Sequence, residues 1–558
     1  MIVHVLAVDY DGTIAAHGRL APETARALGR VRESGRKVVL VTGRLLPDLR
    51  RVCPDVEQMF DAIVAENGAL LYVPARRETR LLGDAPEPTL VEALTRHGVP
   101  IDLGASILAT DEAFAERALT AIRETGVERS LVFNKGSLML LPGGVTKGTG
   151  LAAALAAMEL SPRNVVAVGD AENDHAFLAL AECAVAVAGA VPALKERADY
   201  VTRADDGRGV IELVEEHVLD DLSGLLGRLT RHHLSLGNAA DGTPVTLPAH
   251  RASVLIAGPS QSGKSTLTGL LVERIVRAGR SLCLIDPEGD HQALAELEGC
   301  VVLGGKTERA LATPEEVDQL LRRPTGCIVL NLSALSMAEK VSYATKILPV
   351  VSAVRAASGL PHWLIIDEAH HLVPAEGSAA VDLVRSGAES LALITMSVDL
   401  LAADVRREIR TLLTTDPAAA TGGPPLARGE AMLVPLDGSG APPVRFRVAP
   451  REVEHRRHLR KYTEGELPAD RSFYFRGADA KLNLRAANLA RFVELAEGVD
   501  EATWAHHLGA GDYSRWLRDM IKDPELADQV SGLERDVHLP PADSRRHVLD
   551  AVRARYAV

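Results

Sequence analysis

Short apolar runs alternate with longer stretches of helical periodicity along the first part of the chain. The apolar runs have the length of β-strands and read VHVLAVD, KVVLVTG, AIVAENG, NVVAVGD and CAVAVAG. Helical segments such as PETARALGRVRESG lie between them. Continuous apolar strands that alternate with helices are typical of a parallel sheet covered on both faces. The pattern therefore predicts an α/β domain over residues 1–215.

Residues 71–144 break this rhythm. They contain a helical stretch from Glu112 to Thr125 among strand-like pieces such as LVFNKGSLMLL. We therefore expect a core formed by residues 1–70 and 145–215, with an inserted α+β cap at about 71–144.

A second α/β pattern follows the polar stretch LGNAADGTP. Its predicted strands are SVLIAG, SLCLIDP, GCIVLNL, HWLIIDE and LALITMS, with AMLVPL and VRFRV after them. We assign residues 216–242 to a linker helix and loop, and residues 243–450 to the second α/β domain. The basic segment 451–467 predicts a connecting helix, and residues 468–558 predict a small, mainly helical domain of unknown role.

Composition limits the functional classes. A chain of 558 residues is too long for one core, and its net charge of -13 does not favour a protein that coats nucleic acid. The five cysteines are scattered without a CxxC pair, which fits a reducing compartment. The segment MIVHVLAVDYDG lacks the features of a secretory signal, and no apolar run is long enough to span a bilayer. We expect a cytoplasmic protein without a membrane partner.

Two carboxylates lie at the end of the first predicted strand. Asp9 and Asp11 can both reach the space above the carboxyl edge of the sheet, where open α/β sheets bind ligands. The strand KVVLV brings Thr42 and Gly43 to the same edge. A hydroxyl group and backbone amides there can hold phosphoryl oxygens.

Three later side chains complete this set. Lys147 begins a helix and adds a positive charge, whereas Asp170 follows the strand VVAVG and Asp174 lies in the next loop. A phosphatase with an aspartate nucleophile needs a second acid/base group, a cation for the phosphoryl oxygens and a metal site. The sequence predicts all of these at one sheet edge.

The segments DYDGT, VTGR, ENGA, VTKG and GDAEND, in this order, resemble the haloacid dehalogenase (HAD) superfamily. The resemblance covers residues 1–215 and is closest to the Cof-type branch, whose members carry a large cap between the second and third motifs. It implies a Rossmann-like core and a phosphomonoester hydrolase that acts through an aspartyl phosphate. Within this branch, the chain looks most like the archaeal phosphoglycolate phosphatases and the sugar-phosphate phosphatases, which implies a small phosphorylated metabolite as substrate.

The resemblance also implies residue roles. Asp9 would be the nucleophile, and Asp11 the general acid and then the general base. The residues implied to bind the phosphoryl group are Thr42, Gly43, Lys147 and Asn173, and Asn67 is implied to line the site. The implied ligands of Mg²⁺ are Asp9, the backbone carbonyl of Asp11, and Asp170, with Asp174 close by.

The segment GPSQSGKS matches the phosphate-binding P-loop pattern GxxxxGK[ST] between a predicted strand and a predicted helix. Backbone amides of such a loop cradle phosphates, a lysine reaches the β- and γ-phosphates, and a hydroxyl group binds Mg²⁺. Lys264 and Ser265 fit the last two roles. The residues expected to bind ATP are Gly258, Ser260, Gln261, Ser262, Gly263, Lys264, Ser265 and Thr266.

The strand WLII ends in a second carboxylate pair. Asp367 is placed to hold Mg²⁺, and Glu368 is placed to polarise the attacking water. The glutamate favours ATP hydrolysis over phosphoryl transfer to a second substrate.

The strand LCLIDPEGD, followed later by DEAH, resembles the HerA/FtsK-type translocase ATPases over residues 240–450. That family implies a ring-forming homo-oligomer. The strand LALITMS ends in Thr395 and Ser397 where that family usually has a glutamine, which puts coupled motor action in doubt.

Three functions follow from these patterns. The favoured one is a Mg²⁺-dependent phosphatase with an ATP-hydrolysing module that regulates or assembles it. The alternative is a nucleic-acid end-processing or translocating machine, which the acidic net charge disfavours. The third is a nucleotide-gated scaffold without catalysis, against which the intact Asp9 and Asp11 argue.

Overall fold

The chain forms two compact units, Met1–Ala449 and Pro450–Val558, in a computed structural model. Its described residues are 2–134, 136–259, 262–305, 309–386, 390–418, 423–451, 463, 467, 469, 471–477, 482–521, 523–536 and 538–556. The predicted connecting helix at 451–467 falls almost entirely outside them.

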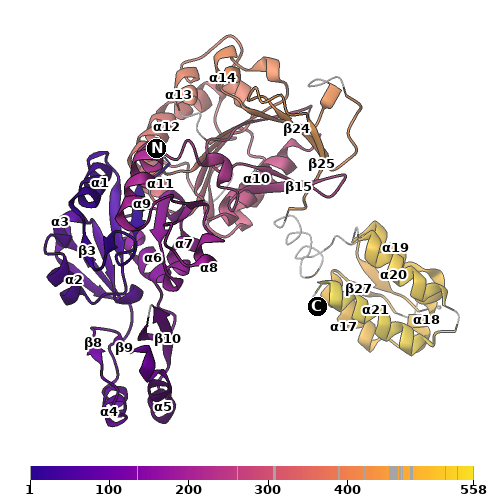
Figure 1. Ribbon diagram of the computed structural model, residues 1–558. Helices are drawn as coiled ribbons and strands as arrows, with labels where there is room; N and C mark the ends of the chain where they lie inside the picture. The colour runs from indigo at the N-terminus through magenta and orange to yellow at the C-terminus, as the bar shows by residue number, and fades with distance from the viewer. Residues whose placement is uncertain are drawn as a thin grey trace. The chain divides into compact units, whose positions relative to one another are not determined.

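Eight strands in the described part of the first domain form one sheet, in the order β14-β13-β12-β1-β4-β5-β6-β7 (Figure 1). These strands are β1 (Val5–Val8), β4 (Lys37–Val41), β5 (Ala62–Ala65), β6 (Leu70–Val73), β7 (Glu78–Leu81), β12 (Val165–Gly169), β13 (Cys183–Ala186) and β14 (Tyr200–Val201). The strands from β14 to β5 are parallel, and β1, β5, β12 and β13 are buried along their whole length. The α/β core is therefore as predicted.

Helices cover this core sheet. They are α1 (Pro22–Glu33), α2 (Leu46–Val52), α3 (Val56–Met59), α6 (Lys147–Ala157), α7 (His175–Leu180), α8 (Pro192–Lys195) and α9 (Asp206–Leu213). Helix α1 packs against α9, and α6 packs against α7. Leu28 and Leu151 belong to one apolar core with the strands.

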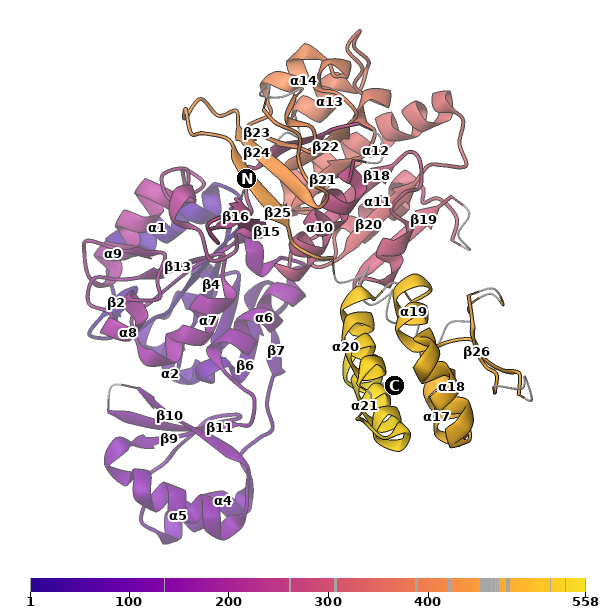
Figure 2. The same ribbon diagram turned by 90° about the vertical axis from the view of Figure 1, so that its right-hand side faces the viewer.

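The cap is shorter than predicted. Its sheet has the order β10-β11-β9-β8, and its strands are β8 (Asp102–Leu103), β9 (Leu108–Asp111), β10 (Arg129–Asn134) and β11 (Ser137–Pro142). This sheet lies between the core and the helices α4 (Pro88–Arg96) and α5 (Ala115–Thr125) in Figures 1 and 2. Placing residues 71–81 in the cap was wrong, because β6 and β7 pair antiparallel with β5 and extend the core sheet.

The second domain is built on a mixed sheet of eleven described strands, in the order β16-β15-β25-β24-β23-β17-β22-β21-β18-β20-β19 (Figure 2). The parallel strands are β17 (Ser253–Ala257), β18 (Leu282–Asp286), β19 (Cys300–Gly304), β20 (Cys327–Asn331), β21 (Trp363–Ile366), β22 (Leu391–Thr395) and β23 (Thr411–Thr414). The antiparallel strands are β15 (Leu234–Ala239), β16 (Pro244–Leu247), β24 (Glu430–Pro435) and β25 (Val444–Val448).

Helices accompany this sheet too, and they are α10 (Lys264–Arg277), α11 (Pro314–Leu321), α12 (Met337–Ser358), α13 (Val381–Ser386) and α14 (Ala403–Arg407). The predicted start at residue 243 was wrong. Residues 234–239 form β15, which pairs with β16 and β25. Its buried Leu234 and Leu236 alternate with an exposed Ser235, a strand signal that the polar composition of the segment concealed.

The junction between these two domains is polar. The guanidinium group of Arg280, from the turn between α10 and β18, lies 2.7 Å from the Glu182 carboxylate, which precedes β13. Nε2 of His250, which precedes β17, lies 3.0 Å from the same carboxylate. In the described residues the apolar clusters of the first domain end at Leu229, and those of the second begin at Leu234. Charged groups at the amino ends of strands therefore connect the two domains.

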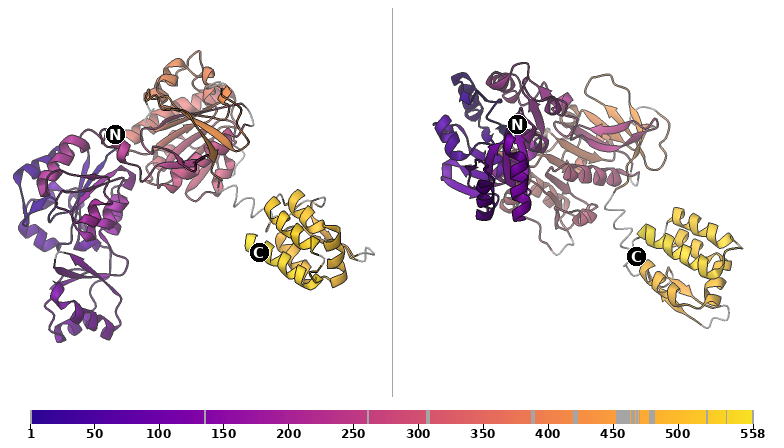
Figure 3. Two further views of the ribbon diagram at one scale, coloured as in Figure 1. Left: turned by 45° about the vertical axis from the view of Figure 1, so that its right-hand side comes forward. Right: turned by 60° about the horizontal axis from the view of Figure 1, so that its bottom comes forward.

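The C-terminal unit is mainly helical. It contains the hairpin β26 (Phe473–Phe475) and β27 (Leu484–Ala486), and the helices α17 (Leu489–Gly498), α18 (Glu501–Ala510), α19 (Asp512–Asp519), α20 (Pro524–Arg535) and α21 (Pro541–Tyr556) (Figure 3). Trp504 stacks on Tyr513 with ring centroids 4.2 Å apart, inside the apolar core of this unit. The aromatic residues therefore serve as core. None of the helices among the described residues has the length and apolar character needed to cross a membrane.

Candidate functional site

Three aspartates meet at the carboxyl edge of the first sheet. Asp9 follows β1 and Asp170 follows β12, and these strands are neighbours in parallel register. Asp174 lies one turn further along the chain. One carboxylate oxygen of each lies within 4.8 Å of the others, and all three side chains are buried. Such a set of oxygen ligands is suited to a hard divalent cation such as Mg²⁺.

Lys147 lies between two of these carboxylates. Its Nζ atom is 2.6 Å from Oδ1 of Asp9 and 2.6 Å from Oδ1 of Asp174. Thr146 fixes the lysine at the start of α6, because its side chain caps the helix. Burial alone would lower the pKa of Lys147, but Asp174 and Asp9 outweigh it and raise this pKa, so the lysine is charged.

The electrostatics of Asp9 follow from this crowding. Burial raises the pKa of Asp9 to about 8, Lys147 opposes the rise, and the charges of Asp174 and Asp170 add to it. A cation bound among the three carboxylates would relieve the repulsion between them. The donor set and its charge therefore fit a metal ion.

Backbone and hydroxyl groups hold the other two aspartates in place. Oδ2 of Asp174 accepts hydrogen bonds from the backbone N–H groups of Asp170 and Ala171, at 2.8 and 2.9 Å. The hydroxyl group of Thr13 donates to Oδ1 of Asp170 at 3.0 Å. The arrangement is thus fixed before any ligand binds.

Asp11 lies apart from the buried cluster. Its carboxylate forms a two-pronged ion pair with the guanidinium group of Arg44, at 2.6 and 2.7 Å, and is 41% exposed. The side chain of Asp11 is not part of the cluster of Asp9, Asp170 and Asp174. It faces a cavity of about 460 Å³ between core and cap, which Thr42, Gly43 and Asn173 also line.

The cap side of this cavity carries both polar and apolar groups. Asp102, Asn134, Ser137 and Met139 line it. Asn134 ends β10 and Ser137 begins β11, and Lys135 lies outside the described residues. Nδ2 of Asn173 donates to Oδ1 of Asn67 at 3.0 Å, so these two predicted lining residues are in contact.

Glu66 is a residue whose role the sequence did not reveal. It is buried, and its carboxylate accepts hydrogen bonds from the backbone N–H groups of Ala105, Ser106 and Ile107 at 2.9 to 3.3 Å. These three residues connect β8 to β9 of the cap. Glu66 therefore ties the core to the cap beside the catalytic cavity. The backbone of Glu66 has a positive φ of 53°, which no sequence pattern predicts.

The second site lies at the carboxyl edge of the second sheet. Gly258 follows β17, and α10 begins at Lys264, with Ser265 and Thr266 in its first turn. Nζ of Lys264 donates to the carbonyl of Pro259 at 3.0 Å. Two of the expected ATP-binding residues, Ser260 and Gln261, lie outside the described residues.

The loop after β17 passes close to the end of β23. A Cβ atom at Gly258 would meet Oγ1 of Thr415 at 2.0 Å, so only glycine allows the loop to pass β23 so closely. The hydroxyl groups of Ser262 and Thr415 are 2.5 Å apart and tie the loop to that strand. The helix begins directly behind the loop and directs its free N–H groups there.

The carboxylate pair lies on a nearby strand end. Asp367 and Glu368 follow β21, which is adjacent to β18, the strand that ends in Asp286. Burial raises the pKa of Glu368, and the charge of Asp367 adds to the rise. Oε2 of Glu368 forms no hydrogen bond among the described residues, and Nδ1 of His370 lies 3.4 Å from it.

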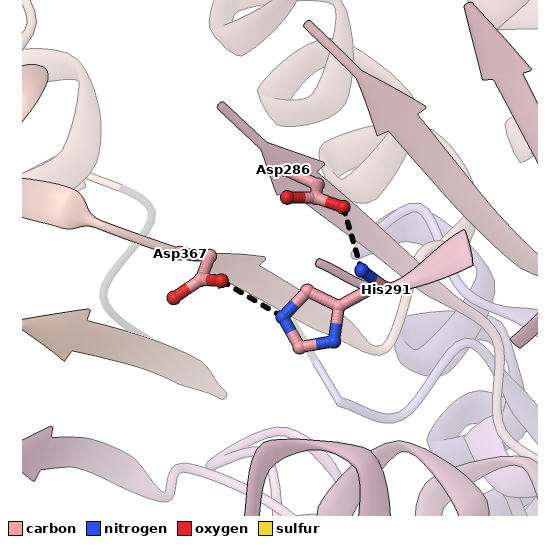
Figure 4. Close-up of side chains that lie close together, drawn as sticks. All are labelled: Asp286, His291 and Asp367. Carbon is pink, nitrogen blue, oxygen red and sulfur yellow. Dashed lines mark hydrogen bonds and ion pairs between the residues drawn. The ribbon is translucent and has the colours of Figure 1, made fainter. Parts of the chain in front are cut away.

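Asp286, His291 and Asp367 lie together at this edge, as Figure 4 shows. No sequence pattern pointed to a role for His291. At the neighbouring strand end, Oγ1 of Thr395 is 3.3 Å from Nδ1 of His370. A histidine therefore contacts the end of β22.

Comparison with known proteins identifies the first domain. Residues 6–116 and 105–214 match the model of the haloacid dehalogenase-like hydrolases. The phosphoglycolate phosphatase of Methanothermobacter thermautotrophicus is 35% identical over 221 residues, which are 38% of this chain and 97% of the relative. That of Haloarcula marismortui is 34% identical over 220 residues, which are 38% of this chain and 95% of the relative.

Solved structures resemble the same part of the chain. The crystal structure of a haloacid dehalogenase-like hydrolase from Bacteroides thetaiotaomicron has 19% sequence identity and a TM-score of 0.34, and it covers 38% of this chain and 99% of its own. The chain belongs to the haloacid dehalogenase-like hydrolase family, and its N-terminal domain is a phosphatase domain of the Cof-type branch.

Proposed function

We propose that the first domain hydrolyses small phosphate monoesters through a phosphorylated Asp9 and requires Mg²⁺. The observation that carries the proposal is the buried contact of Lys147 with Asp174 and with Asp9, which lines the cavity. A free carboxylate oxygen of Asp9 attacks phosphorus, and the bond to the ester oxygen breaks. Asp11 gives that oxygen a proton, so the alcohol leaves.

The second half of the reaction restores the enzyme. Asp11, now a carboxylate, takes a proton from a water molecule, and the resulting hydroxide attacks the phosphorus of the aspartyl phosphate. Inorganic phosphate leaves, and Asp9 is regenerated. Lys147, Thr42, Gly43 and Asn173 bind the phosphoryl oxygens. Mg²⁺ held by Asp9, the Asp11 carbonyl and Asp170, with Asp174 beside them, would neutralise charge on the phosphoryl group.

The cavity favours a small substrate. A volume of about 460 Å³ accommodates a metabolite rather than a polymer. Arg51 lies in the lining and offers a cation to a carboxylate or hydroxyl group of the leaving alcohol. Together with the names of the relatives, this supports a phosphoglycolate- or sugar-phosphate-like ester as substrate.

A screen of small phosphate esters, with and without Mg²⁺, tests the proposal. We expect metal-dependent release of phosphate and its loss in Asp9→Asn. Lys264→Ala, which changes the other domain, serves as the control that leaves phosphatase chemistry intact. Full activity in Asp9→Asn would overturn the assigned mechanism.

We further propose that the second domain binds and hydrolyses ATP and thereby regulates or assembles the phosphatase. The narrow passage at Gly258 and the positions of Asp367 and Glu368 directly after β21 support this. Lys264 would contact the β- and γ-phosphates, Ser265 and Asp367 would hold Mg²⁺, and Glu368 would activate water. Oligomerisation through this domain is part of the proposal.

The test is the ATPase activity of the whole chain. We expect activity in the wild type and its loss in Lys264→Ala and Glu368→Gln. DNA and RNA should leave the rate unchanged. A rate that rises with added polynucleotide would favour the nucleic-acid machine instead.

A further inference from the structure

We propose that His291 is a positioning residue that fixes the carboxylate of Asp367 for the metal-dependent step of ATP hydrolysis. This role rests on the proposed ATPase function of the second domain.

The turn after β18 is wound around a buried carboxylate. Oδ1 of Asp286 accepts hydrogen bonds from the backbone N–H groups of Gly289 and Asp290, at 2.8 and 3.2 Å. Oδ2 accepts one from the backbone N–H group of His291 at 3.0 Å. Asp286 is fully buried. Because three backbone donors bind its oxygens, the carboxylate of Asp286 shapes the turn.

This turn points the imidazole of His291 at the adjacent strand end. Nε2 of His291 lies 2.8 Å from Oδ2 of Asp367, and both side chains are buried (Figure 4). An ionised carboxylate is only an acceptor, so Nε2 carries the hydrogen. The other oxygen, Oδ1 of Asp367, accepts from the backbone N–H group of Glu368 at 2.9 Å. Hydrogen bonds therefore hold both oxygens of the Asp367 carboxylate, so this group cannot rotate freely.

Each oxygen of Asp367 still has a lone pair for the ion or its water. Side chains that donate hydrogen bonds to metal-binding groups orient those groups, and their loss typically reduces metal affinity or activity 10- to 100-fold. His291 has this relation to Asp367. It would act without touching nucleotide, which distinguishes it from Lys264 and Glu368.

Two substitutions separate a positioning role from a merely structural one. His291→Leu fills a similar space without a donor, whereas His291→Gln keeps an N–H donor. We expect His291→Leu to raise the Mg²⁺ concentration that gives half-maximal ATPase activity by about 10- to 100-fold, with activity partly restored at high Mg²⁺. His291→Gln should lie within about threefold of the wild type, by the same reasoning.

The experiment uses the full chain and two controls. Gln292→Leu alters the exposed neighbouring residue and should behave as wild type. Phosphatase activity in the first domain reports on folding and should be unchanged in every variant. Binding of ATP without Mg²⁺ should also be unchanged, because a misplaced carboxylate affects the ion and not the P-loop.

Each outcome decides something. A wild type without ATPase activity would overturn the proposed ATPase function and this role with it. An active wild type whose Mg²⁺ dependence is matched by His291→Leu would overturn the role of His291 alone. His291→Leu and His291→Gln could also lose ATPase activity equally at all Mg²⁺ concentrations and bind metal-free ATP more weakly. That result would show a structural role for His291 and overturn the positioning role.

Discussion

The ammonium group of Lys147 lies 2.6 Å from Oδ1 of Asp9 and 2.6 Å from Oδ1 of Asp174, so one buried cation serves two carboxylates. The lysine side chain is 2% exposed. The contact joins the start of α6 to the end of β1 and to the loop before α7. The same residue is therefore central to the stability of the first domain and to its proposed chemistry.

Lys147→Met should lower both the stability of the first domain and its phosphatase activity. The variant leaves buried carboxylates without a counter-charge, so we expect a loss of about 3–5 kcal/mol in the free energy of unfolding. Phosphatase turnover should fall about 100-fold or more, because a preorganised charge at the phosphoryl group is lost. Urea denaturation and steady-state phosphate release measure the two effects. Lys37→Met removes a half-exposed ion pair to Asp61 and should cost less than about 1 kcal/mol. If Lys147→Met and Lys37→Met lost equal amounts of unfolding free energy, burial would not explain the effect of Lys147.

Gly68→Ala should disrupt the site through the backbone. Gly68 has a φ of 105°, and a Cβ atom there would lie 1.9 Å from the carbonyl oxygen of Thr146, next to Lys147. We expect loss of phosphatase activity and a melting temperature far below that of the wild type. Gly35→Ala is the matched control, with a φ of 87° and no atom within 4 Å of the new Cβ. It should cost only about 1–2 kcal/mol, and similar melting temperatures for the two variants would contradict the steric explanation.

The junction pair Glu182 and Arg280 should show strong coupling. Both side chains are at most 2% exposed. We expect Glu182→Gln and Arg280→Met each to destabilise the chain by about 3–5 kcal/mol, and the double variant by clearly less than the sum. A double-mutant cycle of unfolding free energies measures this coupling. The exposed pair Asp318 and Arg322 provides the comparison and should couple by about 0.5 kcal/mol or less.

His232 should make stability depend on pH. Burial lowers its pKa to about 4, Glu182 opposes this shift, and the charge of Arg163 adds to it. Between the ordinary histidine pKa of 6.5 and about 4, the unfolded chain binds a proton that the folded chain excludes. The stability that neutral His232 contributes is fully present above pH 6.5 and falls as the pH drops toward 4. His232→Gln should therefore lose less stability than the wild type between these pH values, as measured by urea midpoints. If the urea midpoints of His232→Gln and the wild type changed with pH in parallel, the low pKa of His232 would be contradicted.

Local patterns were sufficient to predict which residues gather at the carboxyl edge of the first sheet. Asp9, Thr42 and Asp170 each follow an apolar strand, and parallel strands bring their ends together without knowledge of distant contacts. The same reasoning placed Lys264 at the start of a helix and Asp367 at the end of a strand, where the structure has them.

Contacts between distant segments could not be predicted in this way. Glu66 holds residues some forty positions away through backbone N–H groups, which carry no sequence signal. His291 reaches Asp367 only because a turn winds around Asp286, and Glu182 meets Arg280 across a domain junction. Strand β15 was missed because its polar composition outweighed a short alternation of buried and exposed residues.

The polar junction has a consequence for how the two domains could exist apart. Proteins that share an apolar core expose that core when they are divided, and the pieces aggregate. Here the buried groups are Glu182, Arg280 and His250, which water solvates readily. A chain cut between α9 and β15 should yield two pieces that remain dissolved separately. The affinity of the two pieces for each other should weaken as the salt concentration rises. The strength of the junction between the two domains would then depend on ionic strength.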